Sequence, residues 1–277
     1  MLVYEDACLP PRAYDYVIVA ATLRSMQLTM NLDGATTPVG MPADVEAPFA
    51  EQDRLRQAIR TPHIVSSSKL FGFLPQKPWI CPGNQWPRTP EGEVAKVVLT
   101  DTLARQMYFL DPYPEDPCAG LAVLISYNWG DDAIKHMAIP SDAGLKRAYE
   151  VALETAHASG DVVAASVGRI PDYMLAVVDW QLEPMIFGGF KLDYPEQYRH
   201  TTQVVYQYQR AGERVFLANN NCSYQGGWIE GAMQSGMNAA AAVLRGLGAQ
   251  LREDVEGLFA PNPFQGAVDV VELRYAK

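Results

Sequence analysis

The sequence predicts an α/β (α+β) protein in which two distant segments share one sheet and a sheet-rich insertion separates them. Residues Tyr16–Ala21 (YVIVAA) form a short β-branched run without alternation, which is typical of a strand buried on both faces of a parallel sheet. Near the other end, Val215–Leu247 is predicted as a strand, an Asn- and Gly-rich turn and a long helix of small and apolar residues. Several strand candidates lie between these two segments. The sequence therefore predicts a discontinuous domain that is interrupted by a second one.

The remaining elements are predicted in order from apolar runs and from the breaks between them. Thr22–Met30 is expected to enter a helix or a turn, and Pro38, Pro42 and Pro48 predict a boundary near residue 45. The spacing of apolar residues predicts helices at Glu51–Ile59 and Leu145–Ala158. Glu196–Gln209, which mixes Tyr, Gln and Val, is a further helix candidate. Short runs of β-branched and aromatic residues predict strands at Ser66–Leu74, Val97–Thr100, Gly120–Trp129, Asp161–Val167, Met174–Trp180 and Val215–Ala218.

The composition is that of a globular protein and argues against some classes of partner. Of the 277 residues, 48% are hydrophobic and 10% are aromatic, and the formal net charge is −10. This acidic balance argues against nucleic acid or an anionic membrane as the main partner. No run of about 18 apolar residues is present to span a bilayer. The N-terminal sequence MLVYEDACLPPRAYDY lacks the basic-then-apolar plan of a signal peptide, so we expect a cytoplasmic protein.

The cysteines and histidines predict neither a disulfide framework nor a metal site. The four cysteines are far apart and form no C-x-x-C pair, which favours reduced structural thiols. The four histidines show no i, i+4 ligand spacing, so no metal is expected. Ser66, Ser67 and Ser68 lack a G-x-S-x-G context, so the sequence indicates no serine nucleophile either.

The turn that precedes the C-terminal helix is the most informative feature of the chain. Gly226 and Gly227 allow the backbone to approach a bound ring closely, because neither carries a Cβ. The helix is predicted to begin at Trp228, so that several free N–H groups and a partial positive charge face the space in front of it. Such an arrangement favours a ring that carries negative charge. The alternative is an ordinary strand, turn and helix of an α/β core.

Six blocks carry a family resemblance, namely residues 15–27 (DYVIVAATLRSMQ), 66–71 (SSSKLF), 99–111 (LTDTLARQMYFLD), 124–135 (LISYNWGDDAIK), 179–190 (DWQLEPMIFGGF) and 226–239 (GGWIEGAMQSGMNA). In the same order along the chain, they resemble blocks of the flavin amine oxidase superfamily and, within it, of the FAD-dependent L-amino-acid oxidases and 2-monooxygenases. The resemblance implies FAD as the cofactor and hydride transfer from the Cα–N unit of an L-amino acid, with O2 as the final acceptor. The product would be the imino acid and peroxide in an oxidase, or the shortened amide in a monooxygenase.

The resemblance covers only the C-terminal half of such an enzyme. The dinucleotide fingerprint G-x-G-x-x-G does not occur in this sequence. We therefore expect residues 1–45 and 211–249 to form part of an FAD-binding, Rossmann-like domain, residues 46–210 to form an inserted mixed-sheet substrate domain, and residues 250–277 to form a tail. We further expect a heteromer with a second subunit that carries the fingerprint, with a dimer of heterodimers as one arrangement. A fragment of a longer chain is the alternative.

The resemblance also assigns roles in the insertion. Lys69 aligns with the lysine that holds a water against flavin N5 in relatives, and it is the expected catalytic residue. Tyr127 and Trp129 alternate with Asn128, so both are predicted on one face of a strand. Tyr127 is expected to donate a hydrogen bond to the substrate carboxylate, and Trp129 to line the side-chain pocket. The alternatives are a solvated lysine at a strand end and two core aromatic residues.

Further site residues are implied near the turn and the C-terminal helix. Phe187, Gly227 and Trp228 are expected to contact the substrate. The aromatic residues Trp129, Phe187 and Trp228 favour a hydrophobic or aromatic amino acid, although aromatic pockets also accept the alkyl stems of Lys or Arg. Plain core packing is the alternative for Trp180 and Phe187, and a hydrophobic staple is the alternative for Trp228. The expected contacts to FAD are Trp180, Asn219, Asn220, Gly227, Trp228, Ile229 and Ala232.

One departure from the family pattern concerns the turn at Asn219, Asn220 and Asn221. Relatives usually carry an acidic residue there, which bonds a ribityl hydroxyl of FAD. The amide oxygen of Asn220 can accept the same bond, but more weakly than a carboxylate does. This departure motivates a second hypothesis, a non-catalytic structural or regulatory subunit of the same fold. A third is an amine oxidase that lacks a carboxylate clamp.

Overall fold

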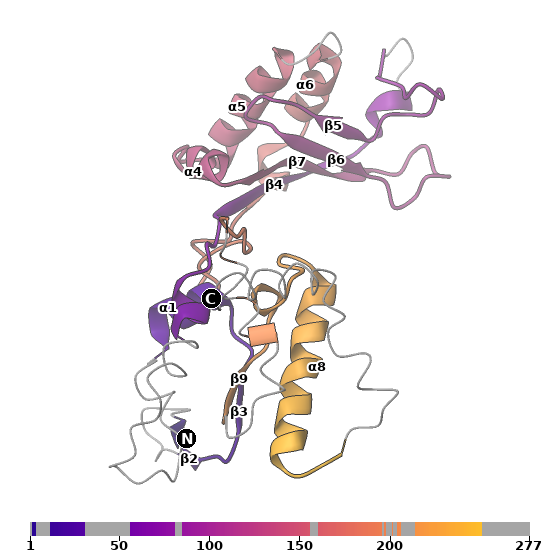
Figure 1. The fold of residues 1–277 in the computed structure, drawn as a ribbon. Coiled ribbons are helices and arrows are strands. Elements are labelled where there is room, and N and C mark those ends of the chain that lie inside the picture. Colours follow the sequence, from indigo (N-terminus) through magenta and orange to yellow (C-terminus); the bar gives the residue numbers. More distant parts are fainter. Residues whose placement is uncertain are drawn as a thin grey trace. The chain divides into compact units, whose positions relative to one another are not determined.

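The chain folds into two compact units, unit 1 (Met1–Ile64 and Pro184–Lys277) and unit 2 (Val65–Glu183). Figure 1 shows the computed structural model. The structure describes residues 2–3, 12–30, 56–80, 85–155, 160–195, 197, 201, 204–205 and 214–250. Unit 1 is therefore discontinuous in sequence, and unit 2 is inserted into it.

Unit 1 contains two parallel strands, each followed by a helix. Strand β3 (Val17–Val19) pairs with β9 (Val215–Leu217), so segments about 200 residues apart in sequence lie side by side (Figure 1). Helix α1 (Leu23–Thr29) follows β3, and α8 (Ile229–Gly246) follows β9 after a short 3-10 helix at Asn220–Cys222. A small antiparallel pair, β1 (Leu2–Val3) with β2 (Arg12–Ala13), completes the described strands of this unit.

Two apolar clusters hold these elements together. Phe216 of β9 packs against Ala239, Ala241 and Ala242 of α8, whose small side chains let the helix lie close to the strand. A second cluster joins α1 and the end of β9 to the segment around Ile59. Its buried members are Leu23, Met26, Ala58, Ile59, Ile64, Val204, Leu217 and Cys222. Burial of about ten such side chains is the main stabilising contribution in this unit.

Unit 2 is a five-stranded antiparallel sheet in the order β5-β6-β7-β4-β8. Its strands are β4 (Ser67–Leu74), β5 (Val97–Leu99), β6 (Gln106–Leu110), β7 (Leu121–Trp129) and β8 (Ala176–Asp179). Helices α4 (Asp131–Met137), α5 (Asp142–Glu154) and α6 (Gly160–Gly168) lie over one face of the sheet (Figure 1). The buried core between sheet and helices includes Leu70, Val123, Ile125, Tyr149 and Val167. The opposite side of the sheet is called the open face below.

A β-bulge in β7 decides which side chains reach the open face. Leu70 of β4 pairs with Ser126, whereas the next residue, Phe71, pairs with Leu124, so Ile125 is the extra residue of β7. Before the bulge, Leu121 and Val123 point toward the helices and belong to the core. After the bulge, the even-numbered residues Ser126 and Asn128 point toward the helices and are buried. The bulge therefore turns Tyr127 and Trp129 onto the open face.

The structure confirms most predicted elements and corrects others. Asp161–Val167 is not a strand but lies within helix α6, because its buried residues Val163, Ala164 and Val167 recur at helical spacing. Strand β6 and helix α4 were not predicted. The sheet of unit 2 is antiparallel among the described strands, not mixed. Residue Ile18 of β3 is 43% exposed, so that strand is not buried on both faces within this chain.

Two predicted helices fall largely or partly outside the described residues. Residues 56–60 are helical, which agrees with the end of the predicted helix Glu51–Ile59. Most of the predicted helix Glu196–Gln209 lies outside the described residues, as do the segment from residue 31 to 55 and the tail from residue 251.

The boundaries of the units differ from those expected near residues 45 and 210. Ile64 forms a bridge with Lys191, and Ala58 and Ile59 pack against Leu23, so all of these residues belong to unit 1. Proline positions predicted a break in the chain, but these long-range contacts decide which domain a segment joins.

Candidate functional site

The open face of unit 2 gathers Lys69, Tyr127 and Trp129 in two neighbouring rows, and the backbone of Trp180 adjoins the second row. In the first row, Tyr127 of β7 pairs with Lys69 of β4, which pairs with Val178 of β8. The Lys69 Nζ lies 4.6 Å from the centre of the Tyr127 ring, a cation–π distance. Lys69 and Tyr127, two of the predicted site residues, therefore lie next to each other, with a positive charge beside a phenol.

The second row contains Trp129 and is adjoined by the backbone of Trp180. Trp129 pairs with Ser67 of β4, and the Ser67 carbonyl accepts a hydrogen bond of 3.1 Å from the backbone N–H of Trp180. Trp129 is 45% exposed although it is a large aromatic residue at a strand end. It also borders a cavity of about 330 Å³ that Leu99, Thr100, Arg105, Gln106 and Asp132 line with it. Core packing, the alternative for Trp129, does not fit this exposure.

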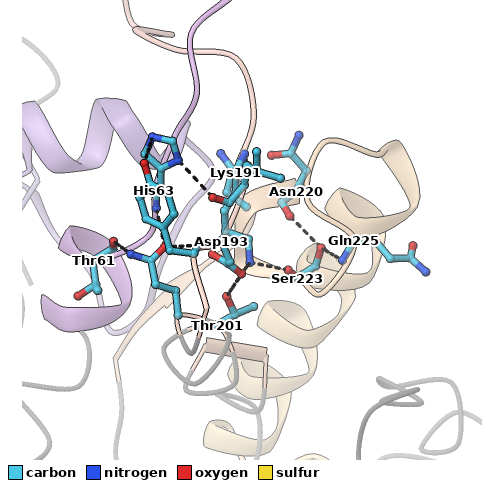
Figure 2. A network of polar contacts seen from close by, with 12 residues as sticks. Thr61, His63, Lys191, Asp193, Thr201, Asn220, Ser223 and Gln225 are labelled. Carbon is cyan, nitrogen blue, oxygen red and sulfur yellow. Dashed lines mark hydrogen bonds and ion pairs between the residues drawn. The ribbon is translucent and has the colours of Figure 1, made fainter. Parts of the chain in front are cut away.

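The other predicted residues lie in unit 1, around the turn between β9 and α8. The Asn219 side chain is used by the fold: its Nδ2 donates to the Ala21 carbonyl at 2.9 Å, and its Oδ1 accepts from the Asn221 N–H at 2.8 Å. Asn221 Oδ1 in turn accepts from the Lys191 N–H at 3.0 Å. The Asn220 side chain points away from this network (Figure 2). Of the three asparagines, Asn220 is therefore the one available to a bound ligand.

A buried lysine that the sequence reasoning missed anchors this turn. Lys191 is 7% exposed, and its Nζ donates to Asp193 Oδ2 at 3.0 Å, Thr201 Oγ1 at 2.6 Å and the Ser223 carbonyl at 3.2 Å (Figure 2). A buried ammonium requires such partners. The only sequence signal was its position, directly after the block at residues 179–190 and two residues before Asp193.

The segment on either side of Lys191 is fixed by further polar contacts. His63 stacks on Tyr194 with ring centres 4.4 Å apart, and the Leu192 N–H donates to the His63 carbonyl at 2.9 Å. The Gln197 side chain accepts from the N–H of Tyr194 and donates to the Thr61 carbonyl. Figure 2 shows Thr61, His63 and Asp193 to one side of the turn that carries Ser223 and Gln225.

The two glycines of the turn are required by its geometry. Gly227 has a φ of +84°, which favours glycine, and a Cβ there would lie 3.3 Å from Phe190 Cβ. A Cβ on Gly226 would lie 3.2 Å from the Lys191 carbonyl oxygen. In both cases the crowding comes from residues 190–191 of the same unit. The close approach seen at these glycines is therefore to a protein segment, and their approach to a bound ring stays a prediction.

Helix α8 begins where the sequence predicted and leaves its first N–H groups available. Trp228 is the N-cap residue, and no side chain among the described residues caps the helix. Trp228 is 69% exposed and Ile229 is 77% exposed, so the hydrophobic staple does not form. Ala232 lies one turn further on, where its N–H donates to the Trp228 carbonyl. An uncapped helix N-terminus beside an exposed indole suits an anionic aromatic ring.

Phe187 occupies a strained backbone position, with a φ of +58°. The neighbouring Met185 also has a positive φ, of 67°. The Thr22 hydroxyl, which caps α1, donates to the Ile186 carbonyl at 2.8 Å and helps to hold this segment. Strain of this kind costs about 1–3 kcal/mol for each residue and is concentrated at ligand sites. Phe187 therefore remains a candidate for contact with the substrate.

The residues of this turn fit a flavin at its ring end. The exposed Trp228 and Ile229, the free N–H groups of α8 and the Asn220 amide would hold the ring and the ribityl chain. Among the described residues, no three His, Cys, Asp or Glu side chains gather as a metal site would require. Within the same residues, no helix is both long and apolar enough to cross a membrane. Burial raises the pKa of the Cys222 thiol to about 12, so this cysteine stays protonated.

Comparison with known proteins agrees with this chemistry. The chain is 35% identical over 248 residues to a tryptophan 2-monooxygenase of Pseudomonas savastanoi, and 32% identical over 249 residues to that of Pantoea agglomerans pv. gypsophilae. Each match covers 87% of this chain and 40% of the relative. A phenylalanine 2-monooxygenase precursor of a Pseudomonas species is 29% identical and is covered to 30%. The chain thus spans well under half the length of these relatives.

Solved structures agree on the fold. A cyclohexylamine oxidase from Brevibacterium oxydans IH-35A superposes with a TM-score of 0.57 at 14% identity, over 89% of this chain and 46% of the oxidase. A variant of putrescine oxidase gives a TM-score of 0.53 over 83% of this chain. These comparisons confirm the predicted α/β fold class.

The model of the family described as flavin containing amine oxidoreductase matches residues 6–244. This match covers both the turn before α8 and the strands that carry Lys69 and Tyr127. It supports the prediction of FAD as the cofactor. The chain therefore belongs to the flavin-containing amine oxidoreductase family.

Proposed function

We propose that the chain is a subunit of an FAD-dependent L-amino-acid oxidoreductase that oxidises the Cα–N bond of a hydrophobic or aromatic L-amino acid. The observation that carries the proposal is the cluster on the open face, where Lys69, Tyr127 and Trp129 lie together. The names of the relatives, tryptophan and phenylalanine 2-monooxygenase, support an aromatic substrate.

The roles of the open-face residues follow from their chemistry. Bound FAD supplies the acceptor for the hydride that leaves the substrate Cα. The Lys69 ammonium holds a water and stabilises negative charge that develops beside it. The Tyr127 phenol donates a hydrogen bond to the substrate carboxylate, and the Lys69 charge favours the same anion. The exposed indole of Trp129 offers apolar surface to the substrate side chain and excludes water from it.

The residues of unit 1 act mainly on the cofactor side. The N–H groups at the start of α8, which no described side chain caps, would stabilise negative charge on the flavin ring. Trp228 borders that ring, and Asn220 accepts a hydrogen bond from a ribityl hydroxyl. Phe187 offers a further aromatic contact to the substrate. Lys191 contacts neither substrate nor cofactor in this scheme, but it holds the turn that presents these groups.

We propose further that a second polypeptide bearing G-x-G-x-x-G completes the enzyme. A parallel sheet is normally covered on both faces, whereas the described part of unit 1 has two parallel strands. Apolar side chains also form an exposed stripe along α8, namely Ile229, Met233, Met237 and Leu244. Both features favour a partner that extends the sheet and covers the helix. The free thiols Cys118 and Cys222 favour a reducing compartment such as the cytoplasm.

Purification of the protein from its native source tests the proposal. We expect a yellow complex that contains the second polypeptide and consumes O2 with L-tryptophan or L-phenylalanine. Product analysis then separates an oxidase, which releases peroxide and the imino acid, from a monooxygenase, which releases the shortened amide. A colourless complex with the same two polypeptides would instead favour a non-catalytic subunit, for which the missing acidic residue at Asn220 is the specific argument.

A further inference from the structure

A buried chain of polar side chains lies directly behind the open-face residues of unit 2. Its members are Asn128 of β7, His136 of α4, Tyr149 of α5 and Asp179 of β8. Asn128 Nδ2 donates to the Tyr149 hydroxyl at 2.8 Å, and the same hydroxyl lies 2.6 Å from His136 Nδ1. Asn128, His136 and Tyr149 are each at most 1% exposed. The network thus joins two strands to two helices inside the core.

The chemistry of these groups fixes the direction of the hydrogen bonds. The Asn128 amide N–H can only donate, so the Tyr149 oxygen accepts from it. Burial raises the pKa of Tyr149 to about 12 and lowers the pKa of His136, so both are neutral at pH 7. The hydroxyl proton of Tyr149 is then directed to His136 Nδ1, which leaves the imidazole proton on Nε2.

The far end of the network faces Asp179. His136 Nε2 lies 3.7 Å from Asp179 Oδ1, and neither atom has a hydrogen-bond partner among the described residues. The distance exceeds that of a hydrogen bond, but an N–H that faces a carboxylate at this range is still attracted to it. Asp179 is thereby drawn toward the helical layer at the end of β8.

Each end of the network adjoins a residue of the proposed site. Asn128 is the residue between Tyr127 and Trp129, and its side chain points to the opposite face from theirs. Asp179 directly precedes Trp180, whose N–H donates to Ser67 between the two tryptophans. A shift of β7 relative to the helices would therefore move Tyr127 and Trp129, and a shift of the end of β8 would move Trp180.

We propose that Asn128, His136, Tyr149 and Asp179 form a positioning network, which fixes Tyr127 and Trp129 on the open face and Trp180 directly after β8. The inference rests on the proposed function, because those three residues are its substrate and cofactor contacts. None of the four network residues touches the substrate in this scheme. Their effect is exerted through the backbone of β7 and of the end of β8.

The test compares Tyr149→Phe with Val167→Ala in the full-length protein, together with any polypeptide that co-purifies. Tyr149→Phe keeps the ring and removes the hydroxyl that joins Asn128 to His136. Val167→Ala is the matched control, since Val167 is fully buried in the same core but lies in α6, outside the network. Both variants are expected to lower the melting temperature.

Hydrogen exchange and kinetics then separate positioning from stability. In Tyr149→Phe we expect faster exchange at the amides of residues 127–130 and 180, and a rise in KM for the amino acid of about tenfold with a smaller change in kcat. Val167→Ala is expected to change neither the exchange at these amides nor the KM. Combining Tyr149→Phe with Asn128→Leu is expected to add little further, because both partners of one hydrogen bond are then absent.

The proposal is overturned if Tyr149→Phe matches Val167→Ala in exchange at these amides. It is also overturned if exchange rises but KM does not. The proposed function fails by a different result, namely that the wild-type protein contains no flavin or does not oxidise an amino acid. In that case the exchange comparison still decides whether the network positions β7 and the end of β8.

Discussion

Replacement of Lys191 by Met is expected to destabilise unit 1 strongly, because it removes a buried charge without changing the length of the side chain much. The lysine Nζ has three oxygen partners, which belong to Asp193, Thr201 and Ser223. The methionine would remove the ammonium donor from all three oxygens, while Asp193 Oδ2 would keep the Thr201 hydroxyl at 3.4 Å. The Asp193 side chain is 22% exposed, so water can only partly replace the ammonium.

The magnitude follows from these contacts. Breaking a buried ion pair by removal of one partner costs about 3–5 kcal/mol, and the partial exposure of Asp193 places the expected loss near the lower limit, at about 3 kcal/mol. For a chain of this size, that loss lowers the melting temperature by roughly 6–12 °C. Thermal unfolding followed by circular dichroism measures it.

Lys96→Met supplies the control for loss of a lysine charge. Lys96 is 42% exposed and lies 3.5 Å from Asp111, so its replacement should cost less than about 1 kcal/mol. If Lys191→Met melts within about 2 °C of the wild type, the anchoring role assigned to Lys191 is wrong. Equal losses of stability in the two variants would contradict that role as well.

Four further outcomes are expected. Tyr127→Phe should lower kcat/KM for an amino acid by about 10- to 100-fold, because a hydrogen bond to a charged group is lost. Unchanged steady-state kinetics would favour an amine oxidase without a carboxylate clamp. Lys69→Met should slow reoxidation of the reduced enzyme by O2 in stopped-flow measurements by about tenfold or more, and an unaltered rate would remove Lys69 from that role. Burial lowers the pKa of His136 in the folded chain, so on acidification the unfolded chain takes up the proton first. The free energy of unfolding should therefore fall as the pH drops below about 6.5. His136→Gln should flatten that part of the pH profile of the melting temperature, and a profile identical to that of the wild type would contradict this assignment. Cys222 should resist alkylation at pH 8 while the exposed Cys118 reacts, because burial raises the Cys222 pKa to about 12; peptide mass spectrometry that finds equal labelling would refute this.

The sequence predicted those elements whose pattern is local. The β-branched run at Val17–Val19, the long strand that ends at Trp129 and the helix start at Trp228 all appear close to their expected positions. Each is specified by neighbouring residues, namely apolar runs, glycines and strand alternation. The family blocks added Lys69 and Tyr127 as site residues, and the sheet register shows that the two are neighbours.

Features that depend on distant contacts could not be predicted in the same way. The bulge at Ile125 reverses the alternation of β7, yet no glycine or turn residue marks it. No sequence pattern distinguishes Lys191 from a surface lysine. Its burial depends on hydrogen bonds to Thr201 and Ser223, which are distant in sequence. The valines and alanines of α6 fit a strand equally well by composition, and packing of Val163 and Val167 against the sheet decides for a helix.

The flavin content of the purified assembly tests the central claim most directly. We predict that this chain and a polypeptide bearing G-x-G-x-x-G co-purify as a yellow complex, whose visible absorption is bleached by L-tryptophan or L-phenylalanine without oxygen. A complex that contains no flavin, or whose flavin is not reduced by any L-amino acid, would contradict the account.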